Sequence, residues 1–534
     1  MSISVQEPRP RSAPEPASRS ARHRRRAAGA KRPGAGPLDA TAVAMLTIAL
    51  SAAGSARPSF WFDEAATISA GTRTVPELWR MVGNIDAVHG LYYLLMHGWY
   101  AVFPATEFAS RLSSALAAGV AAAGVVVLGS QVSTRTVAVT AGILFAVLPR
   151  VTWAGMETRS YALCMAAAVW LTVFCIRVAR RGGRWGWAVY AVLLAGAVLL
   201  NLYLVLIVPA HAAAVLGFGR RPWAFRYWGA ATVAAVAATV PFLMFTQTQL
   251  FQVGWIARVG PDTVGEILQQ QYFDQSRAAA VAGGLILVAG VLSGWWAATR
   301  GSAPYPGTPL RPFLALTLVW IIAPTAAALL YSVVRHPIYY PRYLSFTVPA
   351  FVLLLALCVV AVGRSRAGIA IVLVLFTAST VPTYLFQRGP YAKAYMDYSA
   401  VADVIDRHAA PGDCLVLDNS TTWMPGPIRP LTAGRPTVYQ KLRDYGRGLT
   451  AVQRNRLWDS HLAIWSWADK MPECPALWTV TEYDPTLPVH QRGPALPPGP
   501  RLAKAMAYQV PSRFGFHVVE RWQFSFAQVT KSIR

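Results

Sequence analysis

Long apolar runs dominate the sequence between residues 39 and 386. A helix that crosses a membrane needs about 20 apolar residues, because each residue advances it by 1.5 Å. Eleven segments approach this length and are separated by short polar loops. The pattern therefore predicts about eleven transmembrane helices, over residues 39–56, 110–130, 135–150, 160–179, 186–200, 201–217, 228–246, 279–298, 312–334, 345–363 and 367–386.

The first 37 residues differ from the apolar region. They are rich in Arg, Pro, Ser and Ala, and Arg22 to Arg26 is nearly all basic. Such a composition buries no core, so we expect residues 1–37 to be a disordered tail. The first apolar segment begins only near Leu38, too far along the chain for a signal peptide.

Residues 388–534 have the composition of a soluble domain. Residues 398–408 alternate like an amphipathic helix, and a Pro-Gly-Asp turn separates them from a short apolar run at 414–417. Further strand-like runs occur at 477–481 and 515–519. We therefore expect a small α/β domain after a membrane domain over residues 38–387.

Composition supports a membrane protein. Of the 534 residues, 54% are hydrophobic and 14% are charged, whereas soluble proteins carry about 25% charged residues. The net charge of +25 raises the question of nucleic acid. The basic residues, however, gather in the tail and in alternate loops, so no nucleic-acid partner is expected.

The charges alternate between loops. Counting from a cytoplasmic N-terminus, the inner loops contain Arg135, Arg177–Arg184, Arg220–Arg226, Arg300–Arg311 and Arg364–Arg366. The outer loops contain Asp63, Glu64, Glu77, Asp86, Glu107, Glu157, Asp262, Glu266 and Asp274. This segregation follows the positive-inside rule. It predicts a multi-pass protein of the cell (plasma) membrane with a cytoplasmic N-terminus and an extracytoplasmic C-terminal domain.

The five cysteines fall into two groups. Cys164, Cys175 and Cys358 lie in apolar runs and are expected to pack there. Cys414 and Cys474 lie in the C-terminal domain, where an exported location permits a disulfide. The spacing alone leaves open whether they pair.

An acidic pair, Asp63–Glu64, opens the long external loop over residues 57–109. Two carboxylates directly after a membrane span are costly unless they are solvated or used. One interpretation is a solvated start of the loop. The other is a general base at an active site on the membrane edge.

The same loop carries an aromatic stretch with helical spacing. It includes His89, Tyr92 and Tyr93, and it is typical of a helix that lies in the membrane interface. His89 is a candidate to bind a metal or a substrate, and a structural role is the alternative. Glu107 and Arg111 follow, four residues apart, a spacing that allows an ion pair.

Two further external loops carry charges at the membrane surface. One contains Glu157 and Arg159, which form either an interfacial ion pair or part of a site. The other contains Arg335, His336 and Arg342 around a rigid Pro and Tyr segment. Arginines outside the membrane break the positive-inside pattern, and a lipid phosphate would explain them because the guanidinium fork matches phosphate oxygens. The alternative is that the arginines only snorkel at the ends of the spans.

Taken in order, these motifs resemble a known family. A span followed by Asp63-Glu64, then His89-x-x-Tyr92-Tyr93, then Glu107-x-x-x-Arg111-Leu is similar to the GT-C membrane glycosyltransferases. The resemblance is to the type that includes protein O-mannosyltransferases and the lipid A aminoarabinose transferase (glycosyltransferase family 39-like). It continues through Glu157-Thr-Arg159-Ser-Tyr161 and Pro341-Arg342-Tyr343-Leu344, and covers roughly residues 40–385.

The resemblance implies a polyprenyl-phosphate sugar as donor and an inverting transfer to an acceptor hydroxyl at the outer face of the membrane. Asp63 would be the general base, and Glu64 either a second catalytic acid or a residue that holds Asp63 in place. Arg342 and Arg335 would bind the donor phosphate. The remaining residues that the resemblance assigns to substrate binding are Glu157, Arg159, His89, Tyr92, Tyr93 and His336.

The resemblance favours mannose as the sugar and leaves a glycolipid, a polysaccharide or a protein as the acceptor. Members of the family differ in their use of metals, so a divalent cation remains open. Where many relatives carry His-Pro-Pro before the paired tyrosines, this chain has Val88-His89-Gly90. The detailed role of His89 therefore stays open, and the C-terminal domain does not match the accessory domains of the aminoarabinose transferase or the mannosyltransferases.

Three alternatives remain. Transfer of arabinose or another pentose from a polyprenyl carrier fits the same motifs. A transporter or flippase of lipid-linked sugars suits eleven spans, but transporters usually place ionisable residues near mid-membrane and show internal repeats. Here the charged residues lie at one surface, and no repeat is evident. The third alternative is a non-catalytic membrane protein that binds the cell wall through its outer domain.

Overall fold

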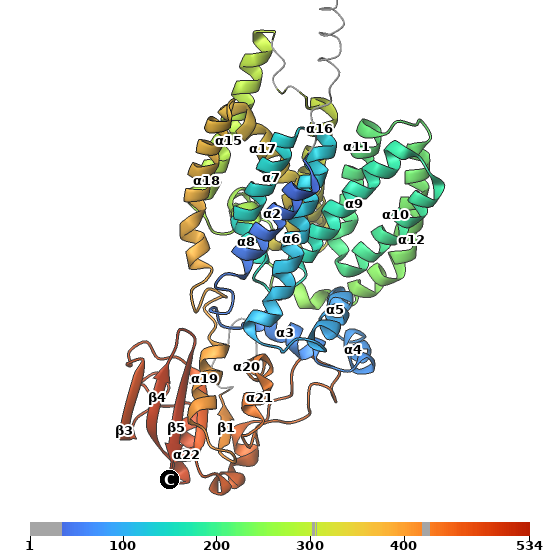
Figure 1. Cartoon of the computed structure of the whole chain (residues 1–534). Coiled ribbons are helices and arrows are strands. Elements are labelled where there is room, and N and C mark those ends of the chain that lie inside the picture. Colours follow the sequence, from blue (N-terminus) through green and yellow to red (C-terminus); the bar gives the residue numbers. More distant parts are fainter. Residues whose placement is uncertain (1–34, 302–304, 306, 419–427) are drawn as a thin grey trace, which may run out of the picture.

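The computed structural model describes residues 35–301, 305, 307–418 and 428–534. Most of the predicted disordered tail, residues 1–34, lies outside the described residues. The described chain forms a helical bundle with a smaller domain, built around a β-sheet, at one end of it (Figure 1).

Seven helices are long and apolar enough to cross a membrane, by length and composition. They are α6 (Glu107–Val132), α9 (Tyr161–Arg181), α12 (Ala224–Gln247), α15 (Arg277–Thr299), α16 (Leu310–Val334), η5 with α17 (Pro341–Gly363) and α18 (Arg366–Phe386). Four shorter apolar helices join them: α2 (Pro37–Ala52), α7 (Arg135–Val147), α10 (Arg184–Leu200) and η2 with α11 (Leu202–Phe218). Together they coincide, within a few residues at each end, with the eleven predicted segments, and the prediction of a polytopic helical membrane protein is confirmed.

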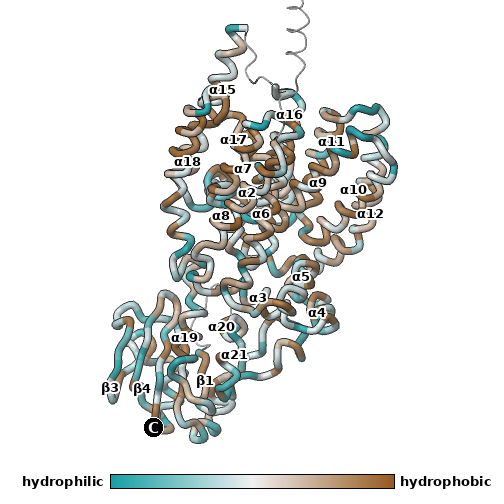
Figure 2. The backbone as a smooth tube through the Cα atoms, viewed as in Figure 1, coloured by the Kyte–Doolittle hydropathy of each residue, from teal (hydrophilic) through white to brown (hydrophobic). Residues whose placement is uncertain are grey.

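Hydrophobic residues predominate along the helices of the bundle, whereas the sheet domain contains more polar residues (Figure 2). Small residues let the helices approach closely, as is usual in membranes. A Cβ atom added to Gly129 of α6 would lie 2.7 Å from the Cα of Ala138 in α7. A Cβ atom added to Gly290 of α15 would lie 2.4 Å from the Cβ of Cys358 in α17. The three cysteines of the apolar runs are buried and free, as expected.

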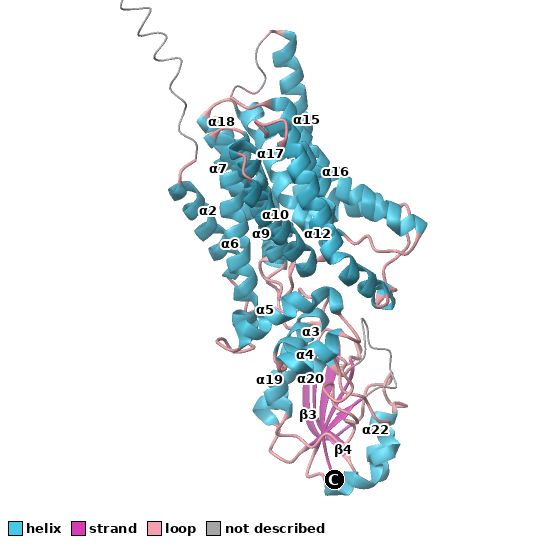
Figure 3. Ribbon diagram, turned by 90° about the vertical axis from the view of Figure 1, so that its right-hand side faces the viewer, coloured by secondary structure: helices cyan, strands magenta, loops and turns pink. Residues whose placement is uncertain are grey.

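Short helices gather at one end of the bundle. In the predicted external loop they are α3 (Phe62–Gly71), α4 (Val75–Val82), η1 (Ala87–His89) and α5 (Gly90–Tyr100). The other short helices of the membrane domain are α8 (Pro149–Ala154), η3 (Leu250–Val253), α13 (Asp262–Gly265), η4 (Glu266–Gln270) and α14 (Gln271–Phe273). The helix predicted from the aromatic spacing is α5. Helices α3, α4 and α5 lie between the bundle and the sheet domain (Figure 3).

The C-terminal domain has the expected α/β character. Its helices are α19 (Tyr398–His408), α20 (Pro430–Gly434), α21 (Pro436–Tyr439), η6 (Ile464–Glu473) and α22 (Met506–Arg513). Its strands are β1 (Cys414–Leu417), β2 (Leu477–Glu482), β3 (His490–Leu496), β4 (His517–Gln523) and β5 (Ala527–Ile533). They form one five-stranded sheet in the order β1-β2-β5-β4-β3. Strands β1 and β2 pair in parallel, and the other pairs are antiparallel.

The sequence predicted three of these strands, with β4 displaced by two residues at its start. It did not predict β3 or β5. One face of β5 buries the polar residues Gln528, Thr530 and Ser532, and Lys531 interrupts the apolar residues of the other face, so its sequence gives a weak strand pattern. Cys414 and Cys474 form a disulfide, which answers the question that their spacing left open.

The sheet domain packs against the external loop of the bundle. Phe60 and Ile68 of the loop share an apolar cluster with Leu415 and Trp478 of the sheet. Ion pairs reinforce the contact, since Arg435 lies 2.7 Å from Glu107 and 2.8 Å from Asp403. The C-terminal domain is thereby docked on the segment that carries the acidic pair.

Asp397 connects the end of the bundle to the sheet. Its buried carboxylate accepts the backbone N–H groups of Phe526 and Ala527, both at 2.8 Å, and its other oxygen has no hydrogen-bond partner among the described residues. Burial raises the pKa of Asp397 from 3.8 to about 6, although the two N–H groups oppose this shift. Because the folded pKa lies above the ordinary value, the folded protein holds this proton more tightly than the unfolded chain.

We therefore expect the raised pKa of Asp397 to add about 3 kcal/mol to the free energy of unfolding below pH 3.8. This contribution should be lost as the pH rises to about 6. Asp397→Asn should raise the thermal midpoint at pH 7 and flatten its pH dependence between these values, because the amide oxygen still accepts both N–H groups. The check is thermal unfolding of the detergent-purified protein across this pH range. Asp469→Asn, at an exposed position, is the matched control. An unchanged pH profile of Asp397→Asn would contradict the assignment.

Candidate functional site

A fully buried ion pair shapes the start of the external loop. Arg111 of α6 donates from Nε and Nη2 to both oxygens of Glu64 at 2.8 and 2.5 Å, and neither side chain is exposed. The same guanidinium donates to the backbone carbonyls of Ser55, Pro58 and Ser59 at 2.6, 2.7 and 3.1 Å. One arginine thus fixes the turn from the first membrane helix into α3.

This arrangement corrects one expectation. Arg111 pairs with Glu64 and not with Glu107, whose partner is Arg435 of the C-terminal domain. Burial alone would raise the pKa of Glu64, but Arg111 holds that pKa below its ordinary value. Glu64 is therefore an ionised carboxylate that holds the loop in place, and its role as a catalytic acid or as a helper of Asp63 stays a prediction.

Asp63 occupies the first turn of α3, and its side chain is turned to a different partner. Its carboxylate lies 3.3 Å from the guanidinium of Arg342, with 16% and 15% of the two side chains exposed. Arg342 follows Pro341 at the start of η5, so the rigid segment noted in the sequence aims it at Asp63. The structure thus joins two of the predicted residues that are 279 positions apart in the sequence.

Aromatic rings surround the Arg342 guanidinium. Its central carbon lies 4.7 Å from the ring centroid of Tyr340, 5.4 Å from that of Trp61 and 5.7 Å from that of Trp255. Such rings stabilise a cation and exclude water from it. Nε of Arg342 is buried and, among the described residues, has no hydrogen-bond partner. The guanidinium therefore retains a donor for a further oxygen ligand.

Glu157 is linked to this pair through Trp61, whose ring packs on Arg342. The indole N–H of Trp61 donates to one oxygen of Glu157 at 2.5 Å, and Lys393 forms an ion pair with the other oxygen. Lys393 belongs to the segment between α18 and α19, and sequence reasoning did not identify it. In the sequence, Lys393 is simply a lysine that follows the last apolar run. Its partner lies 236 residues away, so no spacing rule indicates the pair.

His89, Arg159, Tyr93 and Asp86 form a connected network on the other side of the site. Arg159 donates to Nε2 of His89 at 2.8 Å and to the hydroxyl of Tyr93 at 3.1 Å, and Tyr93 donates to Asp86 at 2.7 Å. Arginine has no acceptor atom, so Nε2 of His89 accepts and Nδ1 carries the proton. Burial, with Arg159 and Arg342 nearby, lowers the pKa of His89 well below its ordinary value, so the ring is neutral.

The proton on Nδ1 of His89 points to no acceptor among the described residues. Asp86 adopts a left-handed backbone conformation, with φ of 59°, and burial raises the pKa of its carboxyl. A non-glycine residue with positive φ is uncommon and often marks a constrained site. The network therefore presents one neutral donor, His89, beside the Asp63–Arg342 pair.

The remaining predicted site residues make fewer contacts with the site. Tyr92 is buried with a hydroxyl that has no partner in the described chain. Arg335 is exposed at the end of α16, and His336 contacts the carbonyl of Pro337 at 3.0 Å. Within the described residues no ion pair joins Arg335 to the site, so its predicted contact with phosphate stays a prediction. In the same part of the chain no group of three or more His, Cys, Asp or Glu side chains is arranged to hold a metal ion.

With this geometry in place, the chain can be compared with known proteins. Models of protein families give no match, and neither do the sequences of curated proteins. The structure is similar to that of ArnT from Cupriavidus metallidurans in the apo state, with a TM-score of 0.54 and 14% sequence identity over 92% of this chain and 97% of that chain. The protein has a GT-C fold.

Two further solved structures are similar at lower scores. ArnT bound to undecaprenyl phosphate has a TM-score of 0.49, with 14% identity over 92% of this chain and 97% of that one. Arabinofuranosyltransferase AftD from mycobacteria has a TM-score of 0.48, with 16% identity over 93% of this chain, which spans 40% of AftD. The fold shared with apo ArnT is the fold that the resemblance of the ordered motifs implies.

Removing one partner of the buried pair is expected to destabilise the protein. Glu64→Gln leaves the Arg111 charge buried and uncompensated, a change that typically costs about 3–5 kcal/mol. The thermal midpoint of the detergent-purified variant should therefore fall well below that of the wild type. Asp262→Asn is the matched control, since this side chain is exposed, and it should shift the midpoint little. Equal midpoints for Glu64→Gln and the wild type would show that the pair does not hold the loop.

Proposed function

We propose that this protein transfers a sugar from a polyprenyl-phosphate donor to an acceptor hydroxyl at the outer face of the cell membrane. The observation that carries the proposal is the contact between Asp63 and Arg342. It places a partly exposed carboxylate beside a guanidinium with an unpartnered donor. An inverting transfer needs these two groups, namely a base for the acceptor and a cation for the leaving phosphate.

The proposed reaction is a single displacement. Asp63 accepts the proton of the acceptor hydroxyl, whose oxygen forms a bond to the anomeric carbon of the sugar. The bond between that carbon and the phosphate oxygen breaks, and its electron pair leaves with the polyprenyl phosphate. The departing group gains negative charge, which the Arg342 guanidinium stabilises. Every atom in this step comes from the donor, the acceptor or Asp63.

The resting contact between Asp63 and Arg342 also explains how the base becomes available. In the structure the guanidinium neutralises the carboxylate. A donor phosphate, which carries its own negative charge, competes for Arg342 and leaves Asp63 free to accept a proton. The neutral His89, with a proton on Nδ1 and no partner for it, supplies a donor to a phosphate oxygen or a sugar hydroxyl without adding charge.

Several features support the donor class and the membrane face. ArnT, which shares the fold, has been crystallised with undecaprenyl phosphate. The basic loops at the ends of α6, α9, α15 and α17 support an inward orientation for the end opposite the site. The docked sheet domain and its disulfide fit an exported location. The charged residues at one end of the bundle favour a surface enzyme over a flippase.

The sugar is proposed as mannose on the resemblance to protein O-mannosyltransferases, with arabinose as the second candidate. The proposed acceptors are a glycolipid, a polysaccharide or a protein. A role for Glu157 follows from its contacts, because Lys393 and Trp61 hold it in one place. Glu157 thereby positions the Trp61 ring that packs on Arg342. We expect it to act through Trp61 as a positioning residue.

Two substitutions separate the proposed roles of base and phosphate ligand. Asp63→Asn should lower turnover by about 10²–10⁴-fold, because the amide accepts no proton, and should leave affinity for undecaprenyl phosphate intact or higher. Arg342→Met should weaken that affinity by roughly 10–100-fold, the value of one charge-assisted contact. The measurements are sugar transfer in lipid nanodiscs and binding of undecaprenyl phosphate to the same preparations.

Asp262→Asn and Arg258→Met are matched controls, since both residues are exposed and, within the described chain, neither forms an ion pair with Asp63 or Arg342. Both should retain wild-type transfer and binding. Full turnover by Asp63→Asn would remove this residue from the mechanism. Unaltered affinity in Arg342→Met would remove the proposed phosphate contact.

A further inference from the structure

A second buried arginine lies near Arg342 and has no role in the transfer described above. Arg150 belongs to α8, directly after α7, and 5% of its side chain is exposed. Its Nη2 lies 3.3 Å from one carboxylate oxygen of Asp274 and donates to the backbone carbonyl of Gln270. Its Nε is buried and has no hydrogen-bond partner in the described chain. Arg150 therefore retains a donor for a further ligand, as Arg342 does.

Helix α14 connects this arginine to Arg342. The two residues that hold the first guanidinium directly precede and follow α14. Within α14, Gln271 accepts the hydroxyl of Tyr339 at 3.2 Å, and the hydroxyl of Tyr272 lies 3.1 Å from that of Thr347. Since Tyr339 and Thr347 lie on either side of Arg342 in the chain, α14 fixes the positions of both guanidiniums. Arg342 is close enough for its charge to act on the other arginine.

The backbone around α14 is irregular in two places. Asp274 has a φ of 55°, which is uncommon for a residue other than glycine. The preceding element η4 is a π-helix that ends at Gln270, and such short π-helices occur frequently at functional sites. Conformations of this kind persist only where the surrounding contacts fix them. Both occur at the two residues that hold Arg150, which indicates a constrained site at this arginine.

The contact between Arg150 and Asp274 differs from the structural pair of Arg111. Arg111 binds both oxygens of its carboxylate partner and three backbone carbonyls, and neither side chain of that pair is exposed. Arg150 contacts one oxygen of Asp274, and 18% of the Asp274 side chain is exposed. The other oxygen of Asp274 accepts the amide of Gln387 at 3.1 Å. Asp274 therefore keeps a partner when Arg150 binds another anion.

The depth of Arg150 in the bundle suits a lipid phosphate. Arg150 follows α7, Asp274 precedes α15, and Gln387 follows α18. The cluster thus lies where three membrane helices end, on the side of the bundle that carries Asp63. The ring of Trp153, whose centroid is 4.9 Å from the central carbon of the Arg150 guanidinium, shields this cation from water. A guanidinium binds phosphate oxygens through its fork of donors.

The charge of the phosphate decides when a second arginine is needed. The phosphate of the donor is a diester with one negative charge, which Arg342 matches. When the bond to the sugar breaks, its electron pair stays on the phosphate oxygen, and the released monoester carries close to two negative charges above its second pKa of about 6. We propose that Arg150 binds the phosphate of the released polyprenyl phosphate and stabilises the charge that this group gains. This inference rests on the proposed sugar transfer.

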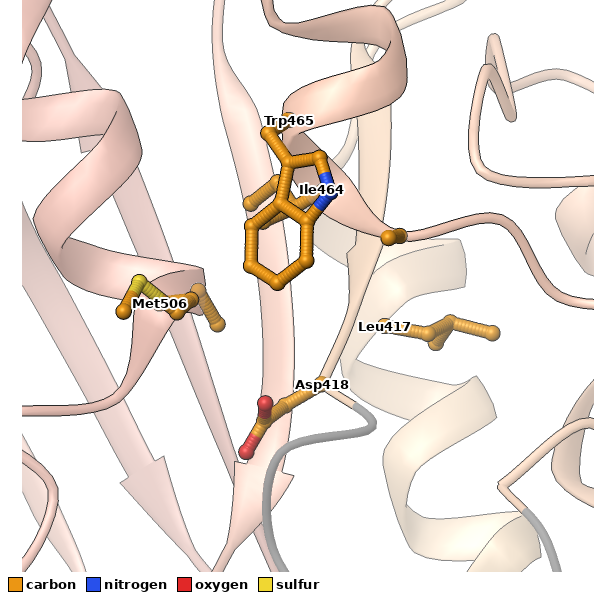
Figure 4. A pocket seen from close by; sticks show the side chains of 7 residues that line it. Leu417, Asp418, Ile464, Trp465 and Met506 are labelled. Carbon is orange, nitrogen blue, oxygen red and sulfur yellow. The ribbon is translucent and has the colours of Figure 1, made fainter.

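The cavity of the C-terminal domain is not an alternative site for this anion. Its volume is about 230 Å³, and Leu417, Asp418, Ile464, Trp465 and Met506 line it (Figure 4). Its described lining residues include one acidic side chain and no basic one. Since like charges repel, a phosphate is favoured at the arginines and disfavoured at this cavity.

The test compares two lipids that differ by one charge at about pH 8. Undecaprenyl phosphate is a monoester with close to two negative charges at this pH, and its methyl ester is a diester with one. Each is titrated by calorimetry into the full-length protein in phosphatidylcholine nanodiscs, with no sugar donor present. Arg150→Met should weaken binding of the monoester by roughly 10–100-fold, the value of one charge-assisted contact, and binding of the diester clearly less. Arg342→Met should weaken both.

Arg277→Met is the matched control, because Arg277 is an exposed arginine close to Asp274 in the sequence, and it should bind both lipids as the wild type does. Arg150→Lys keeps the charge but lacks Nε and the planar fork of donors. It should show an intermediate loss for the monoester, which guards against a folding defect in the methionine variant. Phosphatidylglycerol, a diester without a polyprenyl chain, is the third probe and should compete weakly with undecaprenyl phosphate.

The proposal is overturned if the folded variants of Arg150 bind the monoester as the wild type does, or if they lose equal affinity for the two undecaprenyl lipids. It is also overturned if phosphatidylglycerol competes as well as undecaprenyl phosphate, because the arginine would then bind bulk lipid. In each case a loss of binding in Arg342→Met would leave the proposed transfer at Asp63 intact. Unaltered binding in Arg342→Met would instead count against the proposed function.

Discussion

The buried pair of Glu64 and Arg111 is the constraint on which the site depends. Two charges removed from water are stable only if they neutralise each other and fill their remaining hydrogen-bond positions. Arg111 meets this condition by binding one carboxylate and three backbone carbonyls. The turn between the first membrane helix and α3 therefore has one conformation. That conformation turns the neighbouring Asp63 outward, toward Arg342.

The C-terminal domain completes the same arrangement from the other side. Its connection to the bundle carries Lys393, which neutralises Glu157, and Ser399, which hydrogen-bonds with the backbone of Phe60. Its body supplies Arg435 to Glu107. Each of these contacts satisfies a carboxylate or a backbone group that would otherwise lie unpaired at the membrane edge. The domain is thus part of the structure that holds the site.

The sequence predicted best the features that depend on local interactions, such as the membrane spans. In a bilayer every backbone polar group must be satisfied within its own helix, so apolar length alone predicts the spans. The sequence also indicated Asp63 and Arg342 as candidates, because charged residues next to a membrane span are costly unless they are solvated or used. The choice of ion-pair partners was not predictable, and Arg111 illustrates why. Its neighbour Glu107 is one turn away, but Glu64 and Arg435 arrive from elsewhere in the fold and bind more completely.

The sequence predicted neither the ion pair of Lys393 nor strand β5, and the reasons are related. A lysine outside the apolar runs has the appearance of a solvated charge, and only the folded chain shows that it is buried against Glu157. Strand β5 buries polar side chains, because Gln528 hydrogen-bonds with Gln523 and Tyr508 inside the domain. Both cases depend on contacts across long sequence separations. Such contacts satisfy polar groups in ways that a hydrophobic pattern does not record.

The central claim is that the Asp63 site breaks a bond between a sugar and a polyprenyl phosphate. The most direct test incubates the protein in membranes with purified polyprenyl-phosphate mannose or arabinose, and follows both products by mass spectrometry. We expect a new glycoside of inverted anomeric configuration, with one polyprenyl phosphate released for each sugar transferred. Movement of the intact donor across the membrane, with no cleavage and no glycoside, would contradict it.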